Sequence, residues 1–310
     1  MIITHGFIGI DVSKQYLDVF EGGSSHGYRV ANTDAALAAL MARWTDGSVF
    51  VLFEATGHYD ARPRQALTAA GIAFARVNPA RARDFARAAG FLAKTDRIDA
   101  RMLAAMAQSL VPAPTAVTDR DREGLALAHK RRDQLVQTRQ QERTRRTECH
   151  DAALLADIEA HLQWLDARIA QWDKEIRRLL AQSCQLNQIA TLLRSIPGIG
   201  PVAAATLIAL MPELGVLQSK QVTAIAGLAP FNVDSGQFRG LRRIKGGRKR
   251  VRDALYMAAV AAARSHDRFR TIYRRLRAAG KPAKVALIAI ARKLLVTANA
   301  ILRTKTAFQT

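Results

Sequence analysis

Hydrophobic and polar positions in the first hundred residues follow the pattern of an α/β domain. β-Branched and aromatic runs predict two strands within 7–20 and further strands at 48–55 and 72–79, while helical apolar spacing predicts helices at 33–44 and 61–71. Thr33 stands where an N-cap residue is expected. The order strand, strand, helix, strand, helix, strand predicts a mixed sheet. The turn-rich run "LVPAPTAVTD" then ends the pattern, so we expect a first domain over residues 1–112.

The middle of the chain has the apolar spacing of a long helix. Steps of four and three residues separate Leu154, Ile158, Leu162, Leu165, Ile169, Trp172, Ile176 and Leu179. This alternation is typical of the a/d seam of a coiled coil or a long helical hairpin. An ordinary helix packed on a domain remains the alternative. We expect a helical connector over 119–190 that joins two copies of the chain.

The last segment, 191–310, is predicted to be helical. Its "LLRSIPGIGPVAAATLIALM" places a Pro-Gly-Ile-Gly-Pro turn between two apolar helices, which favours a helix-hairpin-helix over a dinucleotide loop, because the latter needs a preceding strand. In a helix-hairpin-helix, Gly198 and Gly200 would let backbone N–H groups face a phosphate. An apolar hairpin without a ligand is the alternative.

Charge is distributed unevenly along the chain. The formal net charge is +21, and residues 191–310 carry 22 Lys and Arg against 4 Asp and Glu. Such a segment points to a polyanionic partner, and we expect it to bind nucleic acid. Eight of these cations lie within 14 residues and are candidates to bind phosphates: Arg239, Arg242, Arg243, Lys245, Arg248, Lys249, Arg250 and Arg252. The glycines at 246 and 247 lack Walker A spacing, which disfavours an ATPase.

Targeting and redox signals are few. The N-terminus has neither a basic n-region nor an apolar h-region, and apolar stretches such as 202–211 are short of a membrane span, so we expect a cytoplasmic, nucleoid-associated protein without membrane contact. Cys149 and Cys184 have no CxxC partner, which predicts reduced structural thiols.

Four carboxylates form the candidate catalytic and metal-binding set. Asp11 and Glu54 stand at the ends of predicted strands, and Asp96 and Asp99 are three residues apart, so both would lie on one face of a helix. Such a cluster implies Mg²⁺ or Mn²⁺, because carboxylates that converge without a cation raise each other's pKa. Two such ions can activate an attacking oxygen and stabilise a leaving one. Each acid taken alone is more often a cap or a solvated side chain.

These segments resemble a known family along the whole chain. "GIDVSKQYLDV", "FEATGHYD" and "AKTDRIDARMLA" are similar to the three signature blocks of the DEDD transposases of the insertion-sequence 110 family. "SIPGIGPVAAATLIA", "IAGLAPFNVDSGQFRG" and "GGRKRVRDALYMAA" are similar to that family's C-terminal transposase domain. The resemblance implies an N-terminal RuvC-like, RNase H-like domain and a C-terminal transposase domain over 191–310. It also implies that Asp11, Glu54, Asp96 and Asp99 bind the metal.

The resemblance further implies that Ser235 is a catalytic nucleophile. Composition alone favours a plain Asp-Ser-Gly turn, since no His lies nearby as a base and Asp234 is only adjacent. His5 and His58 are weaker candidates, because a lone His is usually structural. We expect a composite site in which the acid set and the surrounding cations assist attack by Ser235 on a phosphodiester.

The expected function is therefore excision and insertion of a mobile element through a serine-linked DNA intermediate. Donor and target DNA are the expected partners, with a structured noncoding RNA from the element as guide, as the resemblance implies. A homodimer is expected, pairing into a tetramer when two duplexes are joined. The alternatives are a metal-dependent, structure-specific endonuclease of the Holliday-junction resolvase type and a noncatalytic nucleic-acid scaffold.

Overall fold

The chain divides into two compact units. The computed structural model describes residues 6–44, 49–57, 59–91, 95–115, 120–231, 234–235, 238–239 and 242–309, with the backbone alone at 234–235 and 238–239. The first unit is Met1–Val117 and the second is Thr118–Thr310. The sequence predicted three regions, 1–112, 119–190 and 191–310. The separation of the last two by function stays a prediction, while in the fold they share one core.

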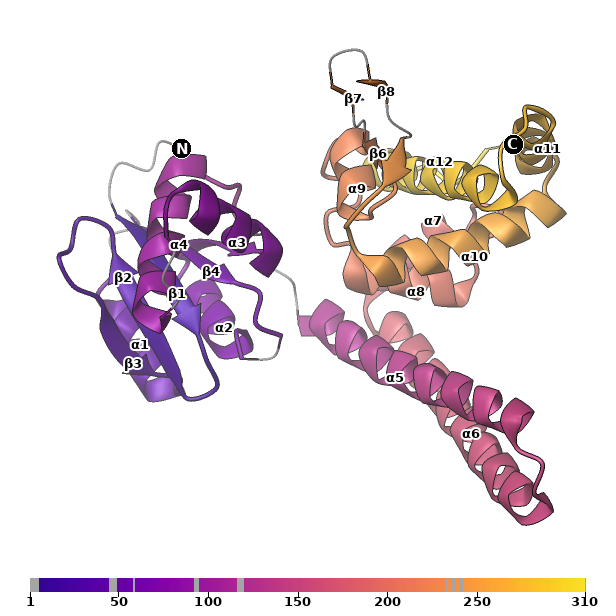
Figure 1. The fold of residues 1–310 in the computed structure, drawn as a ribbon, viewed down its shortest axis with the longest axis horizontal. Coiled ribbons are helices and arrows are strands. Elements are labelled where there is room, and N and C mark those ends of the chain that lie inside the picture. Colours follow the sequence, from indigo (N-terminus) through magenta and orange to yellow (C-terminus); the bar gives the residue numbers. More distant parts are fainter. Residues whose placement is uncertain are drawn as a thin grey trace. The chain divides into compact units, whose positions relative to one another are not determined.

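A five-stranded mixed sheet forms the centre of the first unit, with strand order β3-β2-β1-β4-β5 (Figure 1). β1 pairs with β2 antiparallel and with β4 parallel. The strands are β1 (Phe7–Val12), β2 (Tyr16–Glu21), β3 (Tyr28–Ala31), β4 (Phe50–Glu54) and β5 (Ala73–Val77). The unit's helices are α1 (Asp34–Ala42), α2 (Ala61–Ala69), α3 (Pro79–Ala88) and α4 (Asp96–Leu110).

Each face of the sheet has its own hydrophobic core. Because side chains alternate along a strand, Val51 and Phe53 of β4 pack in a cluster with Leu37 of α1, whereas Phe50 and Leu52 pack in another with α4. The result is a three-layer α/β unit, as the sequence predicted. Thr33 caps α1 as expected, accepting from the backbone N–H of Ala36. Strand β3 and helix α3 were missed, because each is short and carries few apolar residues in a clear period.

The second unit is helical apart from two short β-ladders. Its helices are α5 (Arg120–Glu148), α6 (Ala152–Gln182), α7 (Cys184–Arg194), α8 (Pro201–Leu210), α9 (Ser219–Ile225), α10 (Lys249–Ser265), α11 (Asp267–Ala278) and α12 (Ala283–Thr304). β6 (Pro230–Phe231) pairs with β9 (Arg243–Ile244), and β7 (Asp234–Ser235) pairs with β8 (Phe238–Arg239), both antiparallel. The sequence predicted the helices and missed these ladders, which are only two residues long per strand.

Helices α5 and α6 form a long antiparallel hairpin (Figure 1). The seam predicted on α6 is used inside the chain: Leu165 and Ile169 pack against Leu135 of α5. Of the two alternatives for this seam, a coiled coil or a helical hairpin, the helical hairpin is therefore confirmed. Side chains buried between α5 and α6 are not available to a second copy, so a dimer through this segment would have to use its outer faces. Dimerisation stays a prediction.

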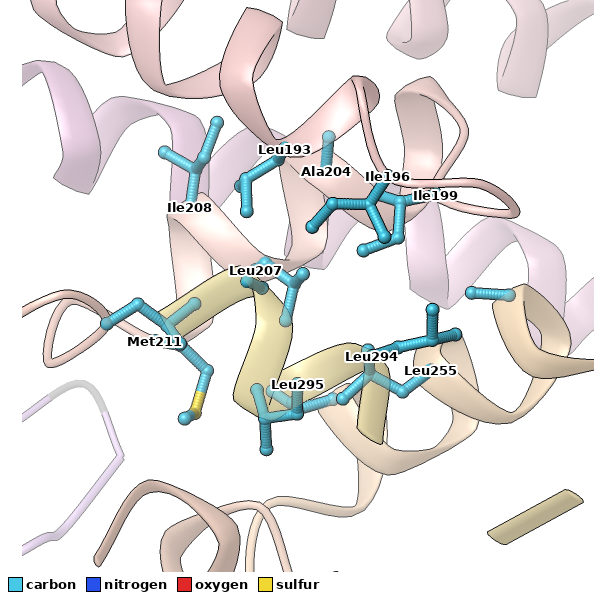
Figure 2. Packing of buried hydrophobic residues seen from close by; sticks show 14 of the residues in the cluster. Leu193, Ile196, Ile199, Ala204, Leu207, Ile208, Met211, Leu255, Leu294 and Leu295 are labelled. Atoms are coloured by element: carbon cyan, nitrogen blue, oxygen red, sulfur yellow. The ribbon is translucent and has the colours of Figure 1, made fainter. Parts of the chain in front are cut away.

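One large core joins the remaining helices of the second unit. Figure 2 shows Leu193 of α7, Leu207 of α8, Leu255 of α10 and Leu294 of α12 meeting in it. The ends of α5 and α6 enter the same core, through residues such as Leu125 and Ile176 in a cluster that continues to α12. This shared burial explains why the connector and the C-terminal helices form one compact unit.

Helix α12 corrects one expectation from the sequence. By length and composition alone it is apolar enough to cross a membrane, although Arg292 and Lys293 interrupt its pattern. Its buried apolar side chains, Ala286, Ile290, Ala291, Leu294, Leu295, Ala298 and Ile301, face the core of the second unit. A core helix passes the same length and composition test, so this finding is weak support for a membrane span.

Candidate functional site

Strand register places the first two candidate acids at one edge of the sheet. In the parallel ladder of β1 and β4, Ile10 lies opposite Phe53. Asp11 and Glu54 are the next residues on these two strands, and each is half-buried. Adjacent parallel strands that end together bring their last side chains close, which is why two acids 43 positions apart in sequence become neighbours.

Helix α4 adds the second pair of acids to this edge. Thr95 caps the helix by accepting from the backbone N–H of Ile98, so Asp96 and Asp99 both fall in its first turn. The helix packs on β1. That approach requires Gly9, because a Cβ there would lie 2.0 Å from the carbonyl oxygen of Ala100. Sequence analysis missed Gly9, since a glycine inside a strand signals a close contact without naming the partner.

The four carboxylates interact with one another. Burial is the largest of the causes that together raise the pKa of Asp11 to about 6; the charges of Asp99, Asp96, Glu54 and Asp18 follow in that order. The tertiary structure thus brings the four predicted acids into mutual electrostatic contact. A carboxylate whose charged form is disfavoured by its neighbours is stabilised by a bound cation.

Arg29 is a cation at this cluster that sequence analysis missed. From β3 its guanidinium donates to both oxygens of Asp18, at 3.1 and 2.8 Å, and to Asp96 at 3.1 Å. Asp18 is almost fully buried on β2, where it lies opposite both Asp11 and Arg29 in the two ladders. The alternation of side chains along β2 and β3 was visible in the sequence. The register between the two strands depends on the tertiary structure and could not be predicted from the sequence.

The acid set suits a hard divalent cation in its chemistry. Carboxylate oxygens are the ligands that Mg²⁺ and Mn²⁺ prefer, and burial together with the neighbouring acids raises the pKa of Asp11. In the part of the chain that the structure describes, no three His, Cys, Asp or Glu side chains are arranged to hold one ion. Asp96 is already paired with the guanidinium of Arg29, and its carboxylate would have to exchange that partner for the metal.

Asn32 joins the two loops that follow the acid-bearing strands. Its side-chain amide donates to the carbonyl oxygens of Ser13, two residues after Asp11, and of Tyr59, five residues after Glu54. Asn32 is buried. A buried amide with both donors used fixes two backbones at once, so this residue positions the acidic edge without belonging to it. His5 and His58 lie outside the described residues.

Ser235 lies on the β-ladder of the second unit. Its backbone pairs with Phe238 at the end of β7, and Asp234 pairs with Arg239. Sequence analysis placed this serine in a turn, whereas its backbone pairs in a strand. The side chains of Ser235 and Arg239 lie outside the described part of the structure, so their roles stay predictions.

The predicted cation cluster divides into paired and unpaired members. Arg248 forks onto Glu213 at 2.7 and 2.6 Å, Lys249 contacts Asp253 at 2.6 Å, and Arg250 lies 3.4 Å from Asp133. Arg252 donates to the carbonyl oxygen of Gly246. These four therefore have partners within the chain. Arg242, Arg243 and Lys245 are exposed and, among the described residues, have no ion pair.

Gly198 and Gly200 lie just before the first residue of α8. Gly198 has φ +86°, and a Cβ there would lie 2.3 Å from the carbonyl oxygen of Ala258, so close packing against α10 requires this glycine. A Cβ on Gly200, the N-cap, would meet open space. Both glycines and Arg250 line a pocket of about 530 Å³ between α5, α8 and α10. The structure thus brings three predicted nucleic-acid residues together, and it gives Gly198 a packing role as well.

A buried histidine missed by sequence analysis borders the same pocket. Nε2 of His129 lies 2.7 Å from the hydroxyl of Thr206, which donates to the carbonyl oxygen of Val202. Because that hydroxyl proton is already used, Nε2 carries a hydrogen and donates it to Thr206. Burial is the main cause that lowers the pKa of His129. This pairing makes His129 a bridge between α5 and α8.

Comparisons with known proteins agree for both units. Residues 8–153 match the DEDD transposase family of IS110 type, and residues 190–274 match the transposase family IS116/IS110/IS902. The pilin gene-inverting proteins of Moraxella lacunata and Moraxella bovis are each 28% identical over 317 residues, covering 96% of this chain and 95% of theirs. An uncharacterized 44.8 kDa protein of insertion element IS116 from Streptomyces clavuligerus is 32% identical over 157 residues, covering 50% of this chain and 38% of its own.

The two family matches follow the order that the sequence resemblance implied: the first covers most of the first unit and continues into the second unit through α5, and the second lies within the second unit. The first includes all four acids, and the second includes the α7–α8 turn and the β-ladders. DEDD-type transposase domains generally use a divalent metal, and transposases act on DNA. The chain belongs to the IS110/IS116/IS902 family of transposases, enzymes of DNA recombination.

Proposed function

We propose that this transposase cuts and rejoins DNA through a phosphoserine link formed by Ser235, with Mg²⁺ or Mn²⁺ held by Asp11, Glu54, Asp96 and Asp99. The observation that carries the metal site is the mutual electrostatic contact of these four acids around Asp11. The family membership of both units supports recombination as the overall reaction.

The chain's own residues prepare the acidic edge. Gly9 admits α4 to the sheet, Asn32 ties the adjoining loops, and Arg29 holds Asp96 and neutralises buried Asp18. When bound, the metal would stabilise negative charge on a phosphate and help to activate an attacking oxygen. In our proposal Asp96 leaves Arg29 to complete the ligand set, and Arg29 keeps Asp18 neutralised.

The proposed covalent step replaces one phosphodiester linkage by another and so conserves the energy of the bond. The Ser235 oxygen attacks phosphorus, the bond to one strand end breaks, and the proton lost by the serine hydroxyl passes to the departing strand as it leaves as a hydroxyl. A hydroxyl of a second strand then attacks the phosphoserine and regenerates the serine, so no energy-rich cofactor is consumed. The exposed Arg242, Arg243 and Lys245 near the ladder suit the nonbridging phosphate oxygens.

Donor DNA, target DNA and a structured noncoding guide RNA complete the proposed assembly, with at least two copies of the chain. The Moraxella relatives carry the name of proteins that invert a pilin gene. Inversion and transposition both exchange strands without net hydrolysis, so the same serine step serves either outcome.

A denaturing gel tests the covalent link. Wild-type protein with labelled donor and target DNA, Mg²⁺ and RNA transcribed from the element's flanks should give a protein–DNA adduct. Ser235→Ala should abolish the adduct, and Asp11→Asn should reduce it strongly. Cleavage that persists in Ser235→Ala without any adduct would make the protein a metal-dependent nuclease. Binding without cleavage in any variant or in wild type would indicate a scaffold.

A mixing experiment tests whether chains share the work. Asp11→Ala and Ser235→Ala proteins are each inactive alone in our proposal. Recovery of strand exchange in the mixture supports an assembly in which one copy supplies the acids and another supplies the serine. Failure at all mixing ratios, with both variants folded and able to bind DNA, contradicts this arrangement.

A further inference from the structure

The surface of α11 and its flanking turns carries cations that no intramolecular role explains. The segment 264–284 has eight Lys and Arg but only one acid, Asp267, and that acid is paired with Arg270 at 2.6 Å. Among the described residues, five of its exposed cations form no side-chain ion pair or hydrogen bond: Arg268, Arg274, Arg275, Lys281 and Lys284. We name these five the α11 surface.

The position of α11 turns these cations outward. Its apolar face is anchored, since Phe269 is fully buried and Ile272 and Tyr273 pack against the core of the second unit. Figure 1 shows α11 at one end of that unit, beside the C-terminal end of α10. With the apolar face inward, the opposite face and the turn into α12 present the cations to solvent.

Fold stability does not account for this charge. Arg274 and Arg277 are three residues apart on α11 and, among the described residues, neither has an ion pair, so like charges repel on one helix face. Lys284 lies in the first turn of α12, and Arg268 lies in the first turn of α11, where the positive end of the helix dipole disfavours a cation. Of the five cations, only Arg275 lies in the last turn of α11, where the helix dipole favours a positive charge. An external polyanion would offset these unfavourable interactions.

The chemistry of the surface favours a duplex backbone. The aromatic residues of 264–284, Phe269 and Tyr273, both face the core, so the surface offers no stacking platform for unpaired bases. Long, flexible cations without acidic neighbours contact phosphates regardless of sequence. α11 has 12 residues, and its length of about 18 Å is enough to follow several phosphates of one strand.

We infer that the α11 surface is a docking site for the phosphate backbone of duplex DNA, distinct from the cations around the β-ladders. The inference rests on the DNA-recombining activity of the family and is independent of the serine and the metal. The surface holds a duplex by charge, so we expect it to set affinity and salt dependence and to leave sequence choice unchanged.

Duplex binding without chemistry tests this inference. Fluorescence anisotropy would follow a labelled DNA duplex in EDTA, without RNA, over a series of salt concentrations. The test variant is Arg268→Gln/Arg274→Gln/Lys284→Gln. The control, Arg143→Gln/Lys174→Gln/Lys220→Gln, removes the same charge from exposed residues elsewhere in the second unit. A charge-keeping variant, Arg268→Lys/Arg274→Lys/Lys284→Arg, controls for the change in side-chain shape.

The test variant should make the slope of log K against log [salt] shallower by about 2 to 3, which corresponds to three lost phosphate contacts at about 0.9 each. Affinity at about 0.1 M salt should fall by roughly two orders of magnitude. The charge-keeping variant should bind like wild type, and the control should lose much less. All variants should keep the wild-type circular dichroism spectrum because the changed side chains are exposed, and the test variant should unfold at the wild-type temperature or slightly above it, because it removes two cations from first helical turns.

Three results would overturn the inference. One is a wild-type slope in the test variant. Another is an equal loss in the control, which would indicate a general effect of net charge. The third is a loss confined to duplex RNA or to vesicles of anionic lipid, with DNA binding intact, which would assign the surface to another partner. Because EDTA stops chemistry, failure of the serine proposal in the adduct assay leaves this measurement unaffected.

Discussion

Arg29 donates to Asp96 across 3.1 Å and thereby holds a carboxylate of α4 beside the sheet edge that carries Asp11. The same guanidinium neutralises buried Asp18. A single arginine therefore joins a carboxylate of β2 to a carboxylate of α4. Its contact with Asp96 is the solvent-exposed one of the two, and it is the contact that can be exchanged at little cost.

Arg29→Gln should lower the free energy of unfolding of the first unit, because Asp18 would keep a buried charge without its partner. Divalent-cation affinity should rise at the same time, since a competing positive charge is removed. Thermal unfolding and Mn²⁺ titration measure the two effects. The double variant Arg29→Gln/Asp18→Asn should recover much of the lost stability; no recovery would show that Asp18 is not the residue left unpaired.

Metal binding at the acid cluster should depend on pH with a midpoint set by Asp11. Its pKa of about 6 means that protons compete with the cation below that pH. Mn²⁺ affinity should weaken by up to about tenfold per pH unit below about 6 and level off above it. Calorimetric titration between about pH 5 and about pH 8 checks this. Asp11→Asn should flatten the profile and lower affinity throughout; an unchanged profile would assign the proton to another group.

Stability of the metal-free protein should show the opposite trend. The folded chain keeps the proton of Asp11 up to about pH 6, whereas the unfolded chain releases it near 3.8. The folded state therefore binds more protons in this window, and the free energy of unfolding falls as pH rises through it. Urea unfolding in EDTA measures the trend. In Asp11→Asn the contribution from this residue should vanish, leaving only the slopes of other groups.

Gly9→Ala should cost about 1 to 3 kcal/mol and weaken metal binding, because the added Cβ would push α4 away from β1 and carry Asp96 and Asp99 with it. Gly124→Ala is the matched control, since a Cβ there meets open space in helix α5, and it should be neutral or stabilising by up to about 1 kcal/mol. Calorimetric unfolding compares the two. Equal stability of the two variants would show that α4 adjusts freely.

Two arginines of the predicted cation cluster should behave differently. Arg248→Gln should lower stability by about 1 to 2 kcal/mol, because it removes the fork onto Glu213 and the hydrogen bond to the carbonyl oxygen of Leu210. Arg242→Gln should leave stability unchanged and reduce the salt slope of DNA binding by about 0.9. Unfolding and anisotropy measurements on both variants separate the roles, and a reversed pattern would contradict them.

The two glycines before α8 offer a further contrast. Gly198→Ala should destabilise the second unit by about 2 kcal/mol or more, because it combines a positive φ with a backbone collision at Ala258. Gly200→Ala should keep the fold, since φ is −82° and its surroundings are open. If a phosphate approaches this N-terminus, Gly200→Ala should still weaken duplex binding. Unaltered binding in Gly200→Ala would leave the turn a packing feature alone.

Local sequence patterns determined much of the architecture. The alternation in 7–20 and 48–55 became β1, β2 and β4, Thr33 became a helix cap, and the a/d spacing on α6 became one side of a helical hairpin. These features depend on the spacing of apolar side chains along one element, and that spacing can be read directly from the sequence. The resemblance to a transposase family followed from short blocks of the same kind, and the comparisons confirmed it.

Contacts between distant elements were decided by the tertiary structure. Such contacts are the approach of α4 to Gly9, the fork of Arg29 onto Asp18, 11 positions away, and the pairing of Arg248 with Glu213, 35 positions away. Register and packing choose such partners, and neither follows from composition or from a single element's periodicity. For this reason the sequence named four acids and eight cations, while the fold decided which acids lie together and which of the described cations have partners within the chain.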